Sequence, residues 1–97
     1  MNYNFEWNPD KAKKNLSKHK VSFELAATII LDPNALSIHD SDHSDMEDRW
    51  ITIGISRNGN ILTFVHTFNE IDDSNISIRI ISARKSTKIE IKQYQGK

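Results

Sequence analysis

Residues 49–68 read RWITIGISRNGNILTFVHTF, and this segment indicates the fold class. Isoleucines at every second position from 51 to 55 give the period of two that is typical of a half-buried strand. Asn58-Gly59 is a pair that tolerates positive φ and favours a tight hairpin turn. Residues 61–68 then alternate again, with Leu62, Phe64, His66 and Phe68 on one face. The sequence therefore predicts two antiparallel strands joined by a hairpin.

Two helices are expected on the N-terminal side of this hairpin. Asn8 is a good N-cap, and Pro9 has no N–H to leave unpaired, so a helix should begin there and run over 9–19. Its apolar stripe would consist of Ala12, Leu16 and His19. Ser22 can cap a second helix that ends at Asp32-Pro33, because a residue before proline is pushed out of the helical region. Helical spacing in this second helix joins Phe23, Ala26, Ala27 and Ile30.

Further strands and a last helix complete the predicted fold. Strands are expected over 3–7, 36–38 and 76–82, the last one after a polar turn at 69–75. Thr87-Lys88-Ile89-Glu90 has the form of a capping box, which predicts a short final helix over 87–95. The expected order is β-α-α-β-β-β-β-α in a single domain over residues 1–97. This is an α+β fold. An antiparallel sheet carries the two N-terminal helices on one face, and the short C-terminal helix is expected to pack on that face as well.

Composition narrows the possible functions. The 97 residues contain no cysteine, which excludes disulfides, thiolate metal sites and cysteine nucleophiles. The longest apolar run is too short to cross a bilayer, and no signal-peptide pattern is present, so a cytoplasmic protein without a membrane partner is expected. The net charge of zero conceals a segregation. Residues 32–48 hold six acids and no Lys or Arg, whereas 79–97 hold six cations, and the first helix region adds Lys11, Lys13, Lys14, Lys18 and Lys20. Such basic segments can bind a polyanion locally, although a solvated helix face would have the same composition.

Several segments together resemble the BrnT toxin family. The blocks K-H-x-V-S-F-E and R-I-I-S-A-R-K make the resemblance specific, since both occur in order and at the expected separation. The resemblance extends over residues 5–94 and rests on FEWNP (5–9), Lys11, NLSKH (15–19), VSFE (21–24), Ala26-Ala27, Asp32-Pro33, DHS (42–44), EDR (47–49), Gly54, RIISARK (79–85), Thr87, Glu90 and Tyr94. One departure is Lys20, where the family usually has glycine, so the turn after the first helix must use a strained left-handed residue or another geometry.

This resemblance implies a ribonuclease toxin of a type II toxin–antitoxin system, with a fold similar to that of the RelE toxins. It also implies a partner, a BrnA-like antitoxin, which would bind operator DNA, so that the toxin meets DNA only indirectly. The expected function is thus a metal-independent endoribonuclease that inhibits translation by cleaving RNA. The alternative is a catalytically degenerate toxin-like module that only partners an antitoxin in operon repression.

Metal-free cleavage of RNA needs a base for the 2′-OH proton, cations for the phosphorane charge and an acid for the leaving oxygen. Arg79 and Arg84 are the expected phosphate clamp, although strict alternation places them on opposite faces unless the strand bends near Ser82. Glu47 could be the general base or could orient a cation. Lys18 and His19, at the end of the first helix, could complete the cationic pocket. The predicted catalytic residues are therefore Lys18, His19, Glu47, Arg79 and Arg84, and the predicted RNA contacts are Lys11, Lys85 and Tyr94.

Each of these residues also has a purely structural interpretation. His19 could cap its helix, Glu47 could be an exposed loop acid, and Tyr94 could pack against the sheet rather than stack on a base. Either arginine could form an ion pair with Glu47 or Glu90. His66 shares a face with Phe64 and is interpreted as a core histidine whose hydrogen bonds are satisfied.

The acidic loop at 39–47 has potential metal ligands, and a metal-dependent hydrolase centred on it is a third possibility. It lacks the spacing of an EF-hand, however, and no H-E-x-x-H helix is present. Neither a metal nor another cofactor is therefore expected.

Overall fold

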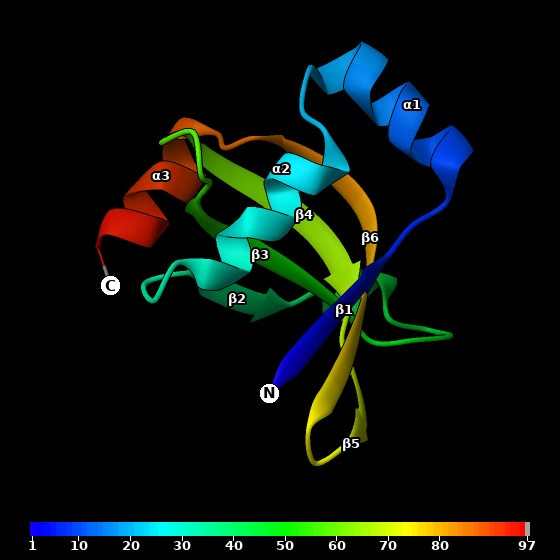
Figure 1. The fold of residues 1–97 in the computed structure, drawn as a ribbon. Helices are drawn as coiled ribbons and strands as arrows, with labels where there is room; N and C mark the ends of the chain where they lie inside the picture. The colour runs from blue at the N-terminus through cyan, green and yellow to red at the C-terminus, as the bar shows by residue number, and fades with distance from the viewer. Residues whose placement is uncertain (97) are drawn as a thin grey trace.

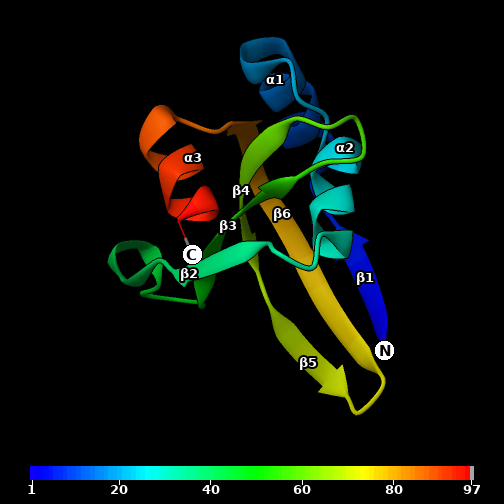
Figure 2. The ribbon, with the colours of Figure 1, turned by 90° about the vertical axis from the view of Figure 1, so that its left-hand side faces the viewer.

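The computed structural model describes residues 1–96 and consists of a strongly twisted sheet with helices on both sides (Figures 1 and 2). In chain order the elements are β1 (Asn2–Glu6), α1 (Pro9–His19), α2 (Phe23–Ala27), the 3-10 helix η1 (Thr28–Leu31), β2 (Leu36–His39), the 3-10 helix η2 (Ser41–His43), β3 (Arg49–Ile55), β4 (Ile61–Thr67), β5 (Asn69–Asp72), β6 (Asn75–Lys85) and α3 (Lys88–Gln95). The predicted α+β class and the order of the predicted elements are confirmed.

The strands lie in the order β1-β6-β4-β3-β2, and β5 pairs with β6 off this path. The hairpin expected at Asn58-Gly59 joins β3 to β4, and Gly59 has the positive φ of 88° that this turn needs. Two details differ from the prediction. β1 pairs with β6 in parallel, because these strands lie at opposite ends of the chain and no hairpin fixes their relative direction. The expected turn at 69–75 contains a strand that was not predicted, β5, which pairs with the first residues of β6 and brings the number of strands to six.

The main core lies between α1, α2 and one face of the sheet. Its buried side chains are Val21, Phe23, Ala26, Ile29, Leu62, Phe64, Ile76, Ile78, Ile80 and Ala83. We call this side the α2 face. Figure 2 shows α3 on the other side of β3 and β4, which we call the α3 face. The expectation that all helices share one face is therefore wrong for α3. The reason lies in the residues that bind α3. Thr63 of β4 and Arg84 of β6 point away from the core, and both hold Glu90 of α3 on that side of the sheet.

The local signals for the helices work as the sequence predicts. The Asn8 side chain accepts hydrogen bonds from the amides of Asp10 and Lys11, and the Ser22 hydroxyl accepts one from Leu25. At α3, Thr87 and Glu90 form the reciprocal capping box. None of the helices in residues 1–96 combines the length and apolar content required to span a membrane.

The apolar stripe predicted for α1 is wrong at one position. Leu16 is 49% exposed, and the buried residue of the helix is Asn15. The Asn15 amide donates to the carbonyls of Val21 and Ala83 and accepts from the Ala83 amide, at 3.0, 2.8 and 3.1 Å. A polar side chain is buried here because all these hydrogen bonds are satisfied, and they attach α1 to β6.

Candidate active site on the α3 face

An irregularity in β6 determines where its arginines point. Val65 pairs with Ser82 but His66 pairs with Ile80, so Ile81 is an extra residue on β6. The alternation of burial changes phase at this bulge, with Ile80 and Ala83 both in the core. Consequently Arg79 and Arg84 both point to the α3 face. Strict alternation would have placed them on opposite faces, and the bulge next to Ser82 removes that difference.

Arg79 is ion-paired with Glu47 near the start of β3. The Arg79 Nη2 atom donates to Glu47 Oε1, and Arg49 Nη2 lies 4.0 Å from the same oxygen. The side chains of Arg79, Glu47 and Arg49 remain 42%, 36% and 34% exposed, and within residues 1–96 the buried Arg49 Nε has no hydrogen-bond partner. Two guanidinium groups and one carboxylate thus converge at the open end of the α3 face. We call these three residues the arginine–glutamate cluster.

Arg49 was not among the residues predicted for the site, and a signal for it existed. In an extended segment residues i and i+2 point to the same side. The Glu47-Asp48-Arg49 triplet at the start of a strand therefore places the carboxylate and the guanidinium together.

Arg84 lies on the same face but has a different partner. Its guanidinium donates to both oxygens of Glu90, at 2.6 and 3.0 Å, and Glu90 Oε1 also accepts from Thr63 and from the Thr87 amide. The hydrogen bonds from Arg84 lower the pKa of Glu90 to about 2, an effect that desolvation of the carboxylate opposes. Arg84 therefore forms the ion pair with Glu90 that was the structural alternative to a role in binding phosphate. This pair holds the first turn of α3 to β6.

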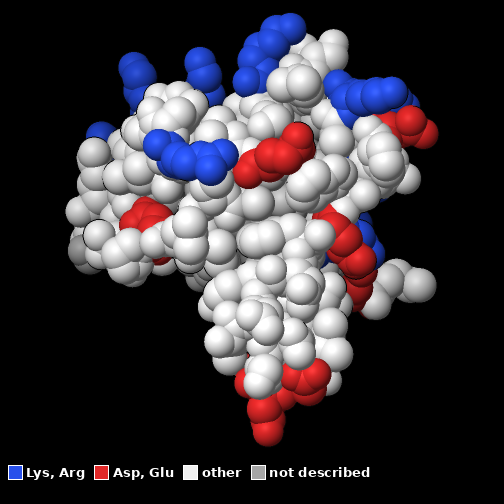
Figure 3. Space-filling view, in the orientation of Figure 1, with Lys and Arg blue, Asp and Glu red and all other residues white. Residues whose placement is uncertain are grey.

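The predicted residues on α1 lie on the other side of the sheet. Lys11 and Lys18 are exposed, and His19 is half-buried at the end of the helix. Lys85 is exposed at the end of β6, two residues beyond Ala83, to which Asn15 attaches α1. These residues form a basic end of the molecule that is distinct from the arginine–glutamate cluster. Figure 3 shows Lys and Arg along the upper part of this face, over α1 and over the side on which α3 lies, and a group of Asp and Glu at the tip of the β5–β6 hairpin.

Tyr94 anchors the far end of α3. Its side chain is 8% exposed, and its hydroxyl donates to Asp32 Oδ2 at 2.6 Å. The Asp32 carboxylate that accepts this bond raises the pKa of Tyr94 to about 12. The same carboxylate oxygen accepts from the Ile55 amide, so that Tyr94 connects α3 to the loop before β2 and to the end of β3. This placement corresponds to the packing alternative for Tyr94.

His66 has the role that the sequence predicts for a core histidine. It is 3% exposed, stacks on Phe64 with ring centroids 4.5 Å apart, and uses both ring nitrogens in hydrogen bonds.

The acidic loop does not form a cluster in the described part of the chain. Within residues 1–96, no group of three or more His, Asp or Glu side chains is arranged to hold a metal ion.

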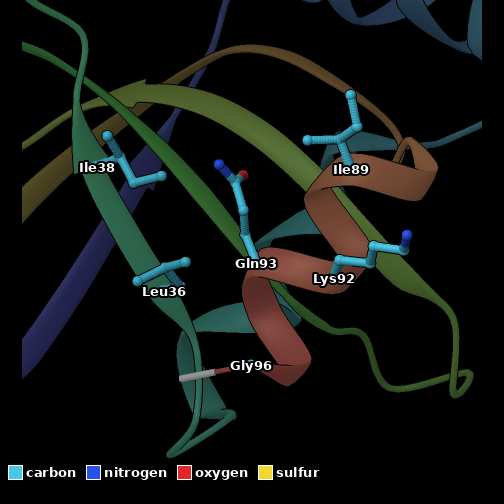
Figure 4. Close-up of a pocket in the computed structure, with 6 residues that line it drawn as sticks. All are labelled: Leu36, Ile38, Ile89, Lys92, Gln93 and Gly96. Carbon is cyan, nitrogen blue, oxygen red and sulfur yellow. The ribbon is translucent and has the colours of Figure 1, made fainter.

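An apolar groove lies beside the cluster on the α3 face, between the edge strand β2 and α3 (Figure 4). It encloses about 570 Å³. Leu36 and Ile38 line it from β2, and Ile89, Lys92 and Gln93 line it from α3. Ile38 and Ile89 are 40% and 72% exposed, so the groove presents apolar surface to solvent beside a lysine.

Comparison with known proteins identifies the family. A sequence model described as "Ribonuclease toxin, BrnT, of type II toxin-antitoxin system" matches residues 7–90, most of the chain. The chain belongs to the BrnT family. No curated protein matches it significantly. Among solved structures, the crystal structure of the Brucella abortus ribonuclease toxin BrnT superposes with a TM-score of 0.62 at 16% sequence identity, covering 91% of this chain and 100% of that one. At this identity the likeness shows a common fold, and the BrnT fold is the one described above.

Proposed function

We propose that this BrnT-family chain is an endoribonuclease toxin that cleaves RNA without a metal ion, at the arginine–glutamate cluster, and thereby inhibits translation. The observation that carries the proposal is the convergence of Glu47, Arg49 and Arg79 on an open surface of a ribonuclease-toxin fold. The cluster combines a carboxylate that can accept a proton with two cations that can bind the phosphate.

The chemistry follows from these groups. The RNA 2′-oxygen attacks the adjacent phosphorus while its proton passes to the Glu47 carboxylate. The guanidinium groups of Arg79 and Arg49 donate to the phosphorane oxygens, where negative charge develops. The bond from phosphorus to the 5′-oxygen then breaks, and this oxygen takes a proton from a water molecule that reaches the exposed cluster. The hydroxide that is left takes the proton held by Glu47, which restores the carboxylate. The products are a 2′,3′-cyclic phosphate and a 5′-hydroxyl end.

In this proposal the other predicted residues act outside the reacting centre. Lys11, Lys18, His19 and Lys85 bind the RNA backbone on the basic end of the molecule, where charge contacts add affinity without sequence preference. Arg84 positions α3 through Glu90, and its removal affects the site through that helix. Tyr94 acts in the same way, through Asp32.

The experiment that tests the proposal measures cleavage of RNA by the purified protein in excess chelator. Cleavage should persist. Arg79→Ala and Glu47→Gln should each reduce the rate on the order of 10²–10³-fold, the typical cost of losing one transition-state charge contact. Arg57→Ala is the matched control, because it removes an exposed arginine outside the cluster and should leave the rate unchanged.

Two results would contradict the proposal. Cleavage that stops in chelator and returns with a divalent cation would replace it with metal-dependent hydrolysis. Full activity of both cluster variants would remove the cluster from the mechanism. A folded protein that binds its antitoxin tightly but cleaves no RNA would be the degenerate toxin-like module instead, and thermal unfolding of each variant separates this outcome from loss of structure.

We also propose that the antitoxin is BrnA-like and binds along β2 and the neighbouring groove. The type II family implies an antitoxin partner. β2 is an edge strand of four residues, and an edge presents unpaired backbone groups to a partner segment. The exposed Ile38 and Ile89 with Lys92 at the rim favour a segment that combines apolar and acidic side chains. Contact with operator DNA would then be made by the antitoxin.

A further inference from the structure

A second, smaller pocket lies on the α2 face, at the same end of the sheet as the arginine–glutamate cluster. It has a volume of about 200 Å³ and is lined by Ser37 of β2, Trp50 of β3, His66 of β4 and Phe68, which follows β4. Pockets for drug-sized ligands have roughly 300–1,000 Å³, so this one suits a single small ring system. The proposed mechanism uses none of these residues.

Aromatic side chains form the walls of this pocket. Trp50 is half-buried and Phe68 is 37% exposed, so both rings are accessible. The His39 ring contacts Trp50 edge to face, with centroids 5.0 Å apart and an interplanar angle of 74°, and this contact fixes the orientation of the indole. Flat, accessible rings of this kind are the surfaces on which proteins stack unpaired bases.

A chain of hydrogen bonds at the back of the pocket has a defined direction. His66 Nδ1 lies 2.9 Å from the Thr67 carbonyl oxygen, which can only accept, so Nδ1 carries the proton. Burial lowers the pKa of His66 and outweighs that backbone hydrogen bond, so the ring is neutral and Nε2 is an acceptor. The Thr52 hydroxyl, 2.7 Å from Nε2, must therefore donate to it.

The same argument extends to the pocket surface. Because Thr52 uses its one hydrogen on His66, the Ser37 hydroxyl, 2.8 Å from Thr52 Oγ1, must donate to Thr52. The exposed Ser37 oxygen then has only lone pairs to offer. A ligand in the pocket must present an N–H or O–H group to Ser37, and a carbonyl at that position would be repelled.

We propose that this pocket binds an unpaired RNA base that carries an amino group, stacked on Trp50 and Phe68 and donating its amino hydrogen to Ser37. The inference deepens the proposed function, since it assumes that the substrate is RNA. Arg49 and Trp50 are successive residues of β3 and point to opposite faces, so an RNA strand passing around this end of the sheet would contact both the cluster and the pocket. The pocket would then select the base near the cleaved bond.

The test is direct binding of mononucleotides, followed through the backbone amides of Ser37, Trp50 and Phe68 and the Trp50 indole in NMR titrations. CMP and UMP are a matched pair, because cytosine has an amino group where uracil has a carbonyl. CMP should shift these signals and bind about 5- to 10-fold more tightly than UMP, the contribution typical of one hydrogen bond. AMP should exceed IMP in the same way.

Two variants separate stacking from hydrogen bonding. Ser37→Ala should reduce the ratio of the CMP and UMP affinities to about one, and Ser37→Thr should restore it, because the hydroxyl returns. Ser37 is exposed, so its replacement leaves the core intact. Trp50→Leu should weaken all nucleotides together. Ser17→Ala, at an exposed position of α1, is the control and should change neither quantity.

The outcomes distinguish this inference from the proposed function. Cleavage of RNA with no nucleotide-induced shift at these residues would overturn the pocket and leave the ribonuclease proposal standing. Selective binding of CMP by a protein that cleaves no RNA would support the pocket and overturn the ribonuclease proposal. Equal binding of CMP and UMP, unchanged by Ser37→Ala, would overturn the hydrogen-bond argument. If these NMR signals shifted on addition of the antitoxin but not on addition of any nucleotide, the pocket would be a protein contact and the inference would be wrong.

Discussion

Lys20 ends α1 in the left-handed region, with φ 60° and ψ 26°, and its amide donates to the Leu16 carbonyl at 2.9 Å. The lysine at this position has a structural consequence, because the chain makes a left-handed turn with a residue that has a Cβ. The turn is retained because Asn15 and Val21, on either side of it, are tied together by a hydrogen bond. The strain at one residue is offset by contacts of its neighbours.

Lys20→Gly should therefore raise the free energy of unfolding by about 1 kcal/mol, since glycine adopts this conformation without the steric cost of a side chain. Urea denaturation monitored by circular dichroism measures the change. Lys14→Gly removes the same side chain from the interior of α1 and should lower the free energy by about 1 kcal/mol. If Lys20→Gly also destabilised the protein, the left-handed turn would not be strained.

At the scale of elements, α3 depends on a few polar contacts at each end. The capping box and the Arg84–Glu90 ion pair hold its first turn, and the hydrogen bond from Tyr94 to Asp32 holds its last. Between them the exposed Ile89 contributes to the groove rather than to the core. These polar contacts therefore fix both ends of the helix, and the buried Tyr94 ring adds apolar burial to them.

The ion pair makes the stability of α3 depend on pH. Glu90 has a folded-state pKa of about 2 against an ordinary value of 4.5, so its contribution is present above pH 4.5 and is lost as the pH falls toward 2. Glu90→Gln should lower the free energy of unfolding at pH 7 by about 1–2 kcal/mol, after allowance for solvent screening of a partly exposed pair. The difference between variant and wild type should disappear near pH 2.

Denaturation at a series of pH values measures this difference. Glu70→Gln, at an exposed position of β5, is the control for removal of a carboxylate and should give a nearly constant, small difference. A Glu90→Gln difference that stayed constant from pH 7 to pH 2 would contradict the assignment of the low pKa to Glu90.

At the scale of the whole molecule, the zero net charge is divided between separate regions. The α1 end is basic, the tip of the β5–β6 hairpin is acidic, and the α3 face combines the arginine–glutamate cluster with an apolar groove (Figures 3 and 4). This division lets one small protein bind two partners of different chemistry. A polyanion would be drawn to the basic regions, and a partner protein with apolar side chains would bind the groove.

The antitoxin proposal predicts that Ile89→Asp weakens antitoxin binding by at least about tenfold, because it places a charge in an apolar contact. RNA cleavage by the free variant should be unchanged, since Ile89 is 72% exposed and lies outside the cluster. Calorimetric titration of toxin with antitoxin, with the cleavage assay beside it, measures both. Ile71→Asp, on the exposed part of β5, is the matched control. Equal antitoxin affinity for both variants and the wild type would place the interface elsewhere.

Features that depend on neighbours along the chain could be predicted from the sequence. The caps at Asn8, Ser22 and Thr87, the hairpin at Asn58-Gly59 and the alternation of β3 and β4 were predicted correctly, because each rests on hydrogen bonds or steric preferences within a few residues. The family also follows from the sequence, because its characteristic blocks occur in order along most of the chain.

Features that depend on residues far apart in the chain required the folded molecule. The extra Ile81 that brings Arg79 and Arg84 to one face, the parallel pairing of β1, and the burial of Asn15 in place of Leu16 all follow from register between strands and from which face a helix covers. The sequence left open whether Arg79 would pair with Glu47 or with Glu90, and only the folded chain decides for Glu47, 32 positions away. Such contacts are fixed by the packing of the complete chain, in which a shift of one residue reverses the face of every side chain that follows.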